Sequence, residues 1–310
     1  MSRCLITYEE ISGDGDYSST GLGRLNPALK ELRPLPLDHR EQLREARDRA
    51  AVMALPGLQR KMSARLSLKE RRFLPVRSHG IYLLKPSLLE FEQVPENEDL
   101  TMRLAGLAGI EVPLHGLHRA ADGSLLYFVR RFDRTGKAGR VHTEDLAQVA
   151  GVTPDRKFGF PLEEVARLLE RHASFPMVDK WKLFRRVLFA WLTGNEEMHL
   201  KDLSLIHQGN VVALSPAYDL VNTAIVRKNP DGEMALSLDG RREGMNRELL
   251  FGYFGRECLE LTREAMDRVA NDLSKALPRW NRLIGRSFLD DRRKSDYRNL
   301  IAKRREVLGW

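Results

Sequence analysis

The spacing of apolar residues predicts that the second half of the chain is mostly helical. Residues 181–192 are apolar over most of the helical circumference, which is typical of a helix buried on several sides. Residues 163–169 are amphipathic, and a late amphipathic helix is predicted where apolar residues recur three and four positions apart. These are Met266, Val269, Ala270, Leu273, Ala276 and Leu277. Between residues 192 and 262 we expect short runs and polar loops.

The first half of the chain predicts strands and loops together with helix. A short apolar run at residues 81–85 stops at Pro86, which suits a strand because proline cannot donate to a strand ladder. Residues 125–132 are rich in strand formers. Residues 13–36, with many Gly, Ser, Asp and Pro, are predicted to be loop or extended chain, whereas the densely charged residues 37–51 are predicted to be helical.

A further helix is predicted to begin near Asn97. Asn97 is suited to the N-cap position, and Gly109 stands where the apolar pattern stops. The apolar residues that share one face of this helix are Leu100, Leu104, Leu107 and Ala108.

The chain's length and patterning favour one large domain or two lobes. It has 310 residues, 42% of them hydrophobic, which is enough to bury a large core. Residues 133–140 are polar and contain two glycines, so we place a boundary there, between a strand-rich lobe of residues 1–133 and a helical lobe of residues 134–310. The predicted fold class is α+β, with the two-lobe plan of protein kinases, which composition alone does not establish.

Composition and charge exclude several classes of protein. Cys4 and Cys258 are too few for a disulfide framework or a structural zinc site, which favours two ordinary thiols in a reducing cytoplasm. No signal peptide and no apolar run of about 18 residues is seen, so a cytoplasmic protein without a membrane span is expected. The net charge of +8 fits either a surface that attracts anions or solvated helix faces, and it does not decide between them.

Two clusters in the first half suit nucleotide binding. Residues 55–61 contain Gly57, which fits a loop whose backbone N–H groups approach phosphate, although a simple turn explains it equally. Lys85 ends a predicted strand, where a lysine is usually a surface residue. At a nucleotide site it would pair with phosphates and with an acidic residue on the next helix, for which Glu98 is the candidate.

Two clusters in the second half follow the order of kinase chemistry. They are residues 194–204, directly after the buried helix, and residues 215–220. In a kinase, an acidic residue accepts the proton of the substrate hydroxyl, a lysine neutralises the moving phosphoryl group, and two further polar residues bind metal. The residues that stand in that order are Glu197, Lys201, Asp202 and Asp219. Taken singly, each cluster could equally be a polar loop.

Six ordered motifs together resemble the HipA-like serine/threonine kinases. They are Gly57–Lys61, Leu84–Pro86, Asn97–Glu98, Arg131–Arg134, Gly194–Lys201 and Ser215–Leu220. The first residues, with Cys4 and Gly21–Leu25, look like the start of the short HipT form. Only about 50 residues precede the predicted phosphate loop around Gly57, which also resembles that form. The resemblance runs along almost the whole chain and weakens in the final third.

The resemblance implies an ATP and Mg²⁺ site. The phosphate loop would comprise Pro56, Gly57, Leu58, Gln59, Arg60 and Lys61. Lys85 would contact phosphate, and the strand that meets adenine would contain Arg130, Arg131 and Phe132. The phosphate and metal side would be closed by His199, Lys201, Asp202, Tyr218 and Asp219.

Three features depart from the family's pattern. Glu197 stands where the family has an aspartate base, and Asp202 where it has an asparagine ligand. Ala54 and Pro56 stand where relatives carry serines that they phosphorylate to silence themselves. The first two departures bear on catalysis and the third on self-regulation.

The resemblance implies a toxin kinase that phosphorylates a translation component such as an aminoacyl-tRNA synthetase and arrests growth. Its partners would be a small HipS-like protein and a HipB-like DNA-binding antitoxin, with nucleic acid contacted only through the antitoxin. The alternative, motivated by Glu197 and Asp202, is a pseudokinase that binds nucleotide and partners but transfers little phosphate. A kinase for a small molecule is the third possibility.

Overall fold

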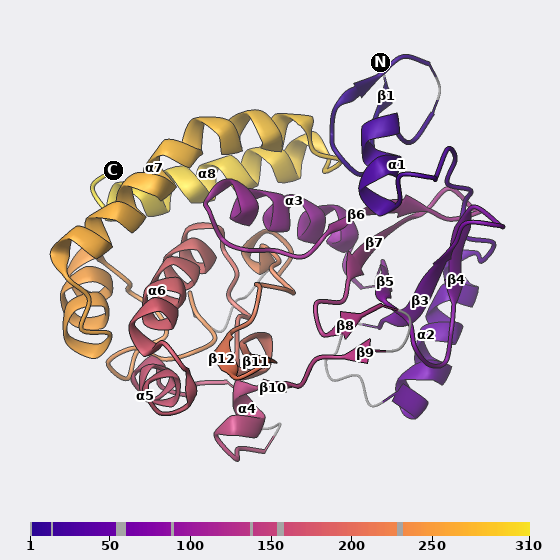
Figure 1. The fold of residues 1–310 in the computed structure, drawn as a ribbon. Coiled ribbons are helices and arrows are strands. Elements are labelled where there is room, and N and C mark those ends of the chain that lie inside the picture. Colours follow the sequence, from indigo (N-terminus) through magenta and orange to yellow (C-terminus); the bar gives the residue numbers. More distant parts are fainter. Residues whose placement is uncertain are drawn as a thin grey trace. The chain divides into compact units, whose positions relative to one another are not determined.

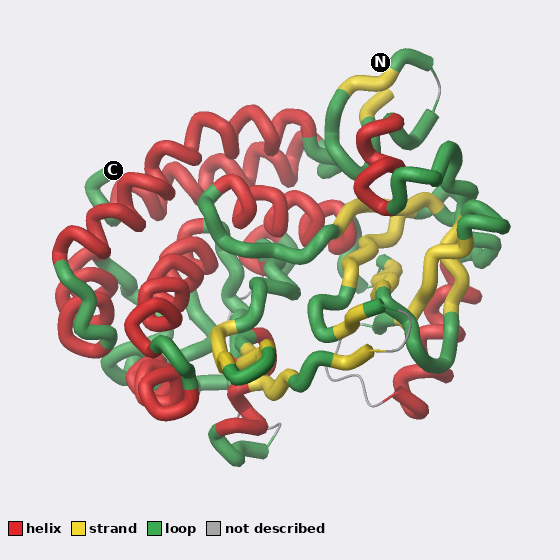
Figure 2. Tube along the Cα trace, viewed as in Figure 1, coloured by secondary structure: helices red, strands yellow, loops and turns green. Residues whose placement is uncertain are grey.

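The computed structural model divides the chain into two compact units (Figures 1 and 2). The first comprises Met1–Asp99, Pro113–Arg140 and Arg286–Phe288, and the second Leu100–Val112, Val141–Gly285 and Leu289–Trp310. The structure describes residues 2–13, 15–53, 60–87, 90–136, 139–153, 158–227 and 232–310. The units are discontinuous in sequence, so a single boundary after residue 133 stays a prediction.

The first unit is built on a five-stranded antiparallel sheet with the order β4-β3-β5-β7-β6. The strands are β3 (Met62–Ser67), β4 (Arg72–Pro75), β5 (Tyr82–Pro86), β6 (His115–Arg119) and β7 (Leu125–Arg130). Helix α2 (His39–Met53) lies against β3 and β5. The smaller elements are β1 (Ser2–Arg3), β2 (Glu10–Ile11), α1 (Ser19–Leu25), β8 (Arg134–Thr135) and β9 (Gly139–Arg140).

The core of the first unit packs aromatic rings against the sheet. The Phe73 ring lies 5.1 Å from the Tyr82 ring and 5.2 Å from the Phe128 ring, centroid to centroid, and all three side chains are buried. Such pairs add to the free energy of burial itself. The aromatic cluster therefore packs side chains of β4, β5 and β7 together.

The second unit is mostly helical, with one three-stranded sheet of order β10-β11-β12. Its strands are β10 (Thr143–Asp145), β11 (Ser204–Gln208) and β12 (Val211–Leu214). The helices include α4 (Leu146–Val149), α5 (Leu162–His172), α6 (Pro176–Leu192), α7 (Arg263–Arg286) and α8 (Asp291–Val307), with short 3₁₀ turns η2 (Leu200–Asp202) and η3 (Thr223–Ile225) and the π-helix η4 (Glu248–Cys258). Helix α3 (Val94–Leu107) begins in the first unit and ends in the second.

Helix α6 lies at the centre of the second unit. It packs against α5, α8, β12 and η4, and nearly every side chain from residue 179 to residue 192 is buried. The helix that residues 181–192 predict is therefore confirmed. The amphipathic patterns of α5 and α7 and the strands β5 and β7 are confirmed as well.

Several predictions of local structure are wrong. Asn97 does not cap a helix but lies inside α3, which begins at Val94 because Pro95 is well tolerated in a first turn. The region predicted as loop or extended contains α1, which Ser18 caps by accepting a 3.0 Å hydrogen bond from the Gly21 amide. Neither η4 nor α8 was predicted.

In the part of the chain that the structure describes, no helix is long and apolar enough to cross a membrane. Cys4 and Cys258 are both free thiols.

Gly80 lies where the chain that enters β5 packs closely against β3. A Cβ atom at Gly80 would overlap Ser63 Oγ and lie 2.8 Å from the Ala64 backbone nitrogen, which cannot rotate away. We expect Gly80→Ala to lower the free energy of unfolding by about 1–3 kcal/mol. In Gly23→Ala the new methyl group meets no atom within 4 Å. This control within α1 should be neutral or gain about 0.5–1 kcal/mol. Urea denaturation measures both, and equal stability of the two variants would contradict the packing.

Candidate active site

Lys85 and Glu98 form a buried ion pair in the first unit. Lys85 is in β5 and Glu98 is in α3; the Lys85 Nζ donates to Glu98 Oε1 at 2.6 Å, and the side chains are 1% and 0% exposed. The Nζ also lies 5.5 Å from the centroid of the Tyr127 ring, on the paired strand β7. The contact is the one that the sequence predicts, while its role towards phosphate stays a prediction.

The predicted phosphate loop lies largely outside the described residues. Pro56, Gly57, Leu58 and Gln59 fall there, so the structure says nothing of them. Arg60 and Lys61 are described and half-buried just before β3, and Arg60 Nη1 donates to the Leu43 carbonyl at 3.4 Å.

The predicted adenine strand uses its amides within the sheet. The Arg130 amide donates to the Leu114 carbonyl at 2.7 Å, and the Arg131 amide donates to the Ile81 carbonyl at 2.8 Å. The Arg131 guanidinium forms a two-point contact with Asp133, at 2.9 and 2.7 Å. A backbone contact to adenine would therefore fall to the carbonyls of this strand or to Phe132.

In the second unit, the chain turns sharply after α6. Gly194 has φ +74°, a left-handed conformation that L side chains rarely adopt. A Cβ atom there would also lie 2.5 Å from Asn222 Oδ1. Glycine is therefore required where α6 passes into the candidate catalytic loop.

His199 and Asp202 contact each other across the 3₁₀ turn η2. The Asp202 carboxylate accepts from the His199 amide at 3.1 Å and lies 2.8 Å from His199 Nδ1. Burial raises the pKa of Asp202, and the negative charge of Asp219 acts in the same direction. The two carboxylates therefore affect each other, and two hard oxygen donors that are both only partly exposed fit a divalent cation.

Lys201 is paired with a residue that sequence analysis missed. Its Nζ donates to Asp145 Oδ2 at 2.9 Å, and Asp145 in β10 is opposite Ser204 in β11. Asp145 also caps α4 together with Gln148, a capping box that the sequence contains. That signal could have located the start of a helix, but not the lysine that Asp145 contacts.

Tyr218 fixes the backbone of the candidate catalytic loop. Its hydroxyl donates to the Lys201 carbonyl at 2.9 Å and lies 2.5 Å from Ser204 Oγ. Burial raises the pKa of Tyr218 well above its ordinary value, and the charges of Asp202, Asp219 and Asp145 add to this effect. Tyr218 thus remains a neutral donor among carboxylates. Asp219, the next residue, adopts φ +54°.

Glu197, the predicted base, forms an ion pair with Arg227. The two side chains are 29% and 36% exposed, so the pair is open to solvent and can separate at little cost. Arg227 follows η3, and nothing in its sequence context indicates this contact.

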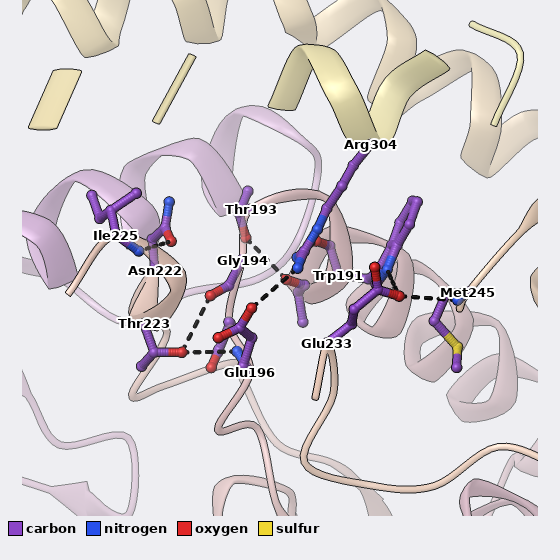
Figure 3. Close-up of polar contacts among 12 residues, drawn as sticks. Trp191, Thr193, Gly194, Glu196, Asn222, Thr223, Ile225, Glu233, Met245 and Arg304 are labelled. Carbon is purple, nitrogen blue, oxygen red and sulfur yellow. Dashed lines mark hydrogen bonds and ion pairs between the residues drawn. The ribbon is translucent and has the colours of Figure 1, made fainter. Parts of the chain in front are cut away.

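A network of polar contacts holds the loop in place (Figure 3). The Glu196 amide donates to Thr223 Oγ1 at 2.9 Å, and Thr223 Oγ1 donates to the Gly194 carbonyl at 3.2 Å. From α8, Arg304 reaches Glu196 Oε1 at 3.2 Å and also donates to the Trp191 carbonyl. The loop is therefore fixed both by η3 and by a helix more than a hundred residues later.

The second unit thus brings together His199, Lys201, Asp202 and Tyr218, with Asp219 close enough to affect two of them. Lys85 and Glu98 form the candidate site of the first unit.

The Lys85–Glu98 pair should be critical for stability. Glu98→Leu leaves a buried ammonium without its carboxylate, and we expect the free energy of unfolding to fall by about 3–5 kcal/mol. The double variant Lys85→Met with Glu98→Leu should recover most of this loss. Asp267→Ala, which breaks the exposed pair with Arg263, is the control and should cost no more than about 1 kcal/mol. If denaturation shows that Glu98→Leu lowers the free energy of unfolding no more than the control does, the pair does not stabilise the fold.

Comparisons with known proteins show the family of the chain. A family model for the HipA-like C-terminal domain matches residues 53–280. "Putative kinase" of Haemophilus influenzae is 30% identical over 257 residues, which are 79% of this chain and 74% of that protein. "Putative kinase Y4dM" of Sinorhizobium fredii is 35% identical over 65% of this chain and 54% of its own length. The serine/threonine-protein kinase toxin HipA of Shewanella oneidensis is 24% identical over 60% of this chain. The match spans 47% of that toxin.

Two solved structures share the fold. HipA of Shewanella oneidensis MR-1, solved with HipB and operator DNA, superimposes with a TM-score of 0.71 at 20% identity, over 91% of this chain and 74% of that one. The Helicobacter pylori proinflammatory kinase CtkA gives a TM-score of 0.54 at 13% identity, over 74% and 85%. The fold is thus the α+β, two-lobed, kinase-like fold that the sequence predicts. With the family model matching most of its length, the chain belongs to the HipA-like kinase family.

Proposed function

We propose that the protein is an ATP- and Mg²⁺-dependent serine/threonine protein kinase. The observation that carries the proposal is the buried Lys85–Glu98 pair, because a strand lysine paired with a helix glutamate is the arrangement by which protein kinases position phosphate. The turn that contains His199, Lys201 and Asp202 supports it from the second unit.

In the proposed reaction, the oxygen of a serine or threonine hydroxyl bonds to the γ-phosphorus of ATP. The bond between that phosphorus and the β–γ bridging oxygen breaks, and ADP leaves. Glu197 accepts the hydroxyl proton, and Lys201 offsets the charge of the moving phosphoryl group. Asp202 and Asp219 would hold Mg²⁺, which supplies charge neutralisation at the phosphates. Tyr218 acts as a positioning residue because its hydroxyl holds the Lys201 carbonyl.

We further propose that the kinase is the toxin of a HipBST-like toxin–antitoxin system. It would phosphorylate a translation-related protein such as an aminoacyl-tRNA synthetase and so arrest growth. A HipB-like DNA-binding antitoxin and a small HipS-like protein would be its partners. The similarity to a HipA that was solved with HipB and operator DNA supports the antitoxin partner.

One observation favours a second candidate, a pseudokinase that binds nucleotide with little phosphoryl transfer. Glu197 is paired with Arg227, and Asp202 contacts His199, so both residues that depart from the family's pattern already have partners. Glu197 must leave its contact with Arg227 before its carboxylate can reach a substrate hydroxyl.

ATP·Mg²⁺ should stabilise the protein through Lys85 and Asp219. A ligand that binds only the native state adds about 2.7 kcal/mol at one hundred times its Kd. We expect the melting temperature of the wild type to rise with ATP·Mg²⁺, and this rise to be largely lost in Lys85→Ala and in Asp219→Ala. Lys30→Ala, at an exposed lysine, is the control and should respond as the wild type does. Equal stabilisation of all four proteins would refute the assignment of the site.

Restoring the family's residues should separate the two candidate functions. Glutamate is one methylene longer than aspartate, and a misplacement of about 1 Å can cost on the order of 10²-fold in rate. We therefore expect Glu197→Asp with Asp202→Asn to raise transfer of labelled phosphate to protein in a cell extract. Glu306→Asp, at an exposed position in α8, should leave transfer unchanged.

If transfer stays negligible in the double variant while ATP still binds, the pseudokinase is favoured. A large fall in transfer would show that the site is adapted to Glu197 and Asp202. Because both residues serve one reacting centre, the effect of the double variant need not equal the sum of the single effects.

A further inference from the structure

The second unit contains a half-open pocket beside the candidate catalytic loop. Its volume is about 540 Å³, which falls within the usual size of ligand sites. One wall comes from the segment around η3, with Ile225 and Arg227, and the other from α8, with Leu300 and Lys303. The lining of the pocket therefore combines apolar and charged side chains.

The lining of this pocket is strongly basic. Among described residues it contains four cationic side chains, Arg227, Arg292, Arg293 and Lys303, and one carboxylate, Asp296. Arg292 Nε lies 3.9 Å from Asp296 Oδ2, a weak and exposed contact, and Arg293 pairs with Asp290. Lys303 is exposed and has no acidic partner in the described part of the chain. This excess of donors suits a ligand with several carboxylates or phosphates.

One side chain links the pocket to the proposed base. Arg227 lines the pocket and forms the ion pair with Glu197. Its amide donates to the Thr223 carbonyl at 2.9 Å. Thr223 Oγ1 accepts from the Glu196 amide (Figure 3), so the backbone around the pair is fixed. An anion that competes for the Arg227 guanidinium would therefore release the Glu197 carboxylate without moving the backbone.

The lining favours a polypeptide over a nucleic acid. Among the described residues it holds no aromatic side chain on which a base could stack. Ile225 and Leu300 offer apolar contacts to side chains. A polypeptide that presents its hydroxyl to Glu197 also passes close to Arg227, because the two side chains touch.

We propose that this pocket binds an acidic segment of the polypeptide substrate, and that Arg227 exchanges Glu197 for a carboxylate of that segment. The inference rests on the proposed kinase function for its second half, the release of the base. Binding itself requires only the pocket. An acidic substrate would thus free the Glu197 carboxylate that accepts its hydroxyl proton. A neutral substrate would meet Glu197 still paired with Arg227.

Binding can be measured on the full chain without ATP, by fluorescence anisotropy. The probes are a labelled peptide with one serine flanked by glutamates and its counterpart with glutamines. We expect the glutamate peptide to bind at least about tenfold more tightly, and Lys303→Glu or Arg292→Glu to remove most of that difference. Lys275→Glu, an equal charge reversal at an exposed position in α7, should remove little of it.

Equal binding of the two peptides would overturn the proposal, as would a loss in Lys275→Glu as large as in Lys303→Glu. A single-stranded oligonucleotide that binds more tightly than the glutamate peptide and is equally sensitive to Lys303→Glu would overturn it in favour of nucleic acid.

With ATP·Mg²⁺ present, the exchange at Arg227 is tested by phosphorylation of the same peptides. We expect the glutamate peptide to have the lower KM, and Arg227→Gln to raise the rate with the glutamine peptide while abolishing the preference. If both rates fall in Arg227→Gln, the exchange is wrong. Acidic peptide that binds but receives no phosphate would refute the proposed kinase function and leave the binding pocket standing. Transfer without acidic preference would refute the pocket alone.

Discussion

The second unit depends on the charged side chains that α6 buries and on the few contacts that they make. Arg185 and Arg186 are 5% and 3% exposed. Burial lowers the pKa of Arg186 to about 10, and its Nη2 donates to the Ser215 carbonyl at 2.7 Å. A guanidinium removed from water needs acceptors, and this one has a single acceptor among the described residues, at the start of the segment that carries Tyr218. The helix therefore fixes both candidate loops, one through its C-terminal end at Gly194 and the other through Arg186.

The elements that could be predicted from the sequence are those whose pattern depends on neighbouring residues. The apolar circumference of residues 181–192 and the strand that stops at Pro86 depend on neighbours in sequence, and both elements are present. The pairing of Lys85 with Glu98 could be predicted because a strand lysine at a nucleotide site pairs with an acidic residue on the next helix. Asn97 was misplaced because three more residues, including Pro95, extend the helix before it. Asn97 suits an N-cap and Pro95 suits a first helical turn, and the sequence alone does not decide between these two starting points.

The contacts that sequence analysis missed are those between distant segments. Asp145 reaches Lys201 through strand pairing, and Arg227 reaches Glu197 because η3 turns back towards the loop. The excess of positive charge, part of which lies at the C-terminal end, fitted either an anion-attracting surface or a solvated helix face. The structure divides it: Arg304 is 5% exposed and binds Glu196, whereas Lys303 is exposed and lines the pocket. Neighbouring residues of like charge thus do different things, because a helix turns them towards different surroundings.

The contact between Arg304 and Glu196 has a consequence for synthesis on the ribosome. It joins residues 108 positions apart, and the chain is made from its N-terminus at about 5–20 residues per second. A nascent chain that has released α6 and the following loop still lacks α8, so Glu196 is left without its guanidinium. The loop acquires its final support only when α8 has left the ribosomal tunnel. This order of events delays the completed loop until translation of α8 is over.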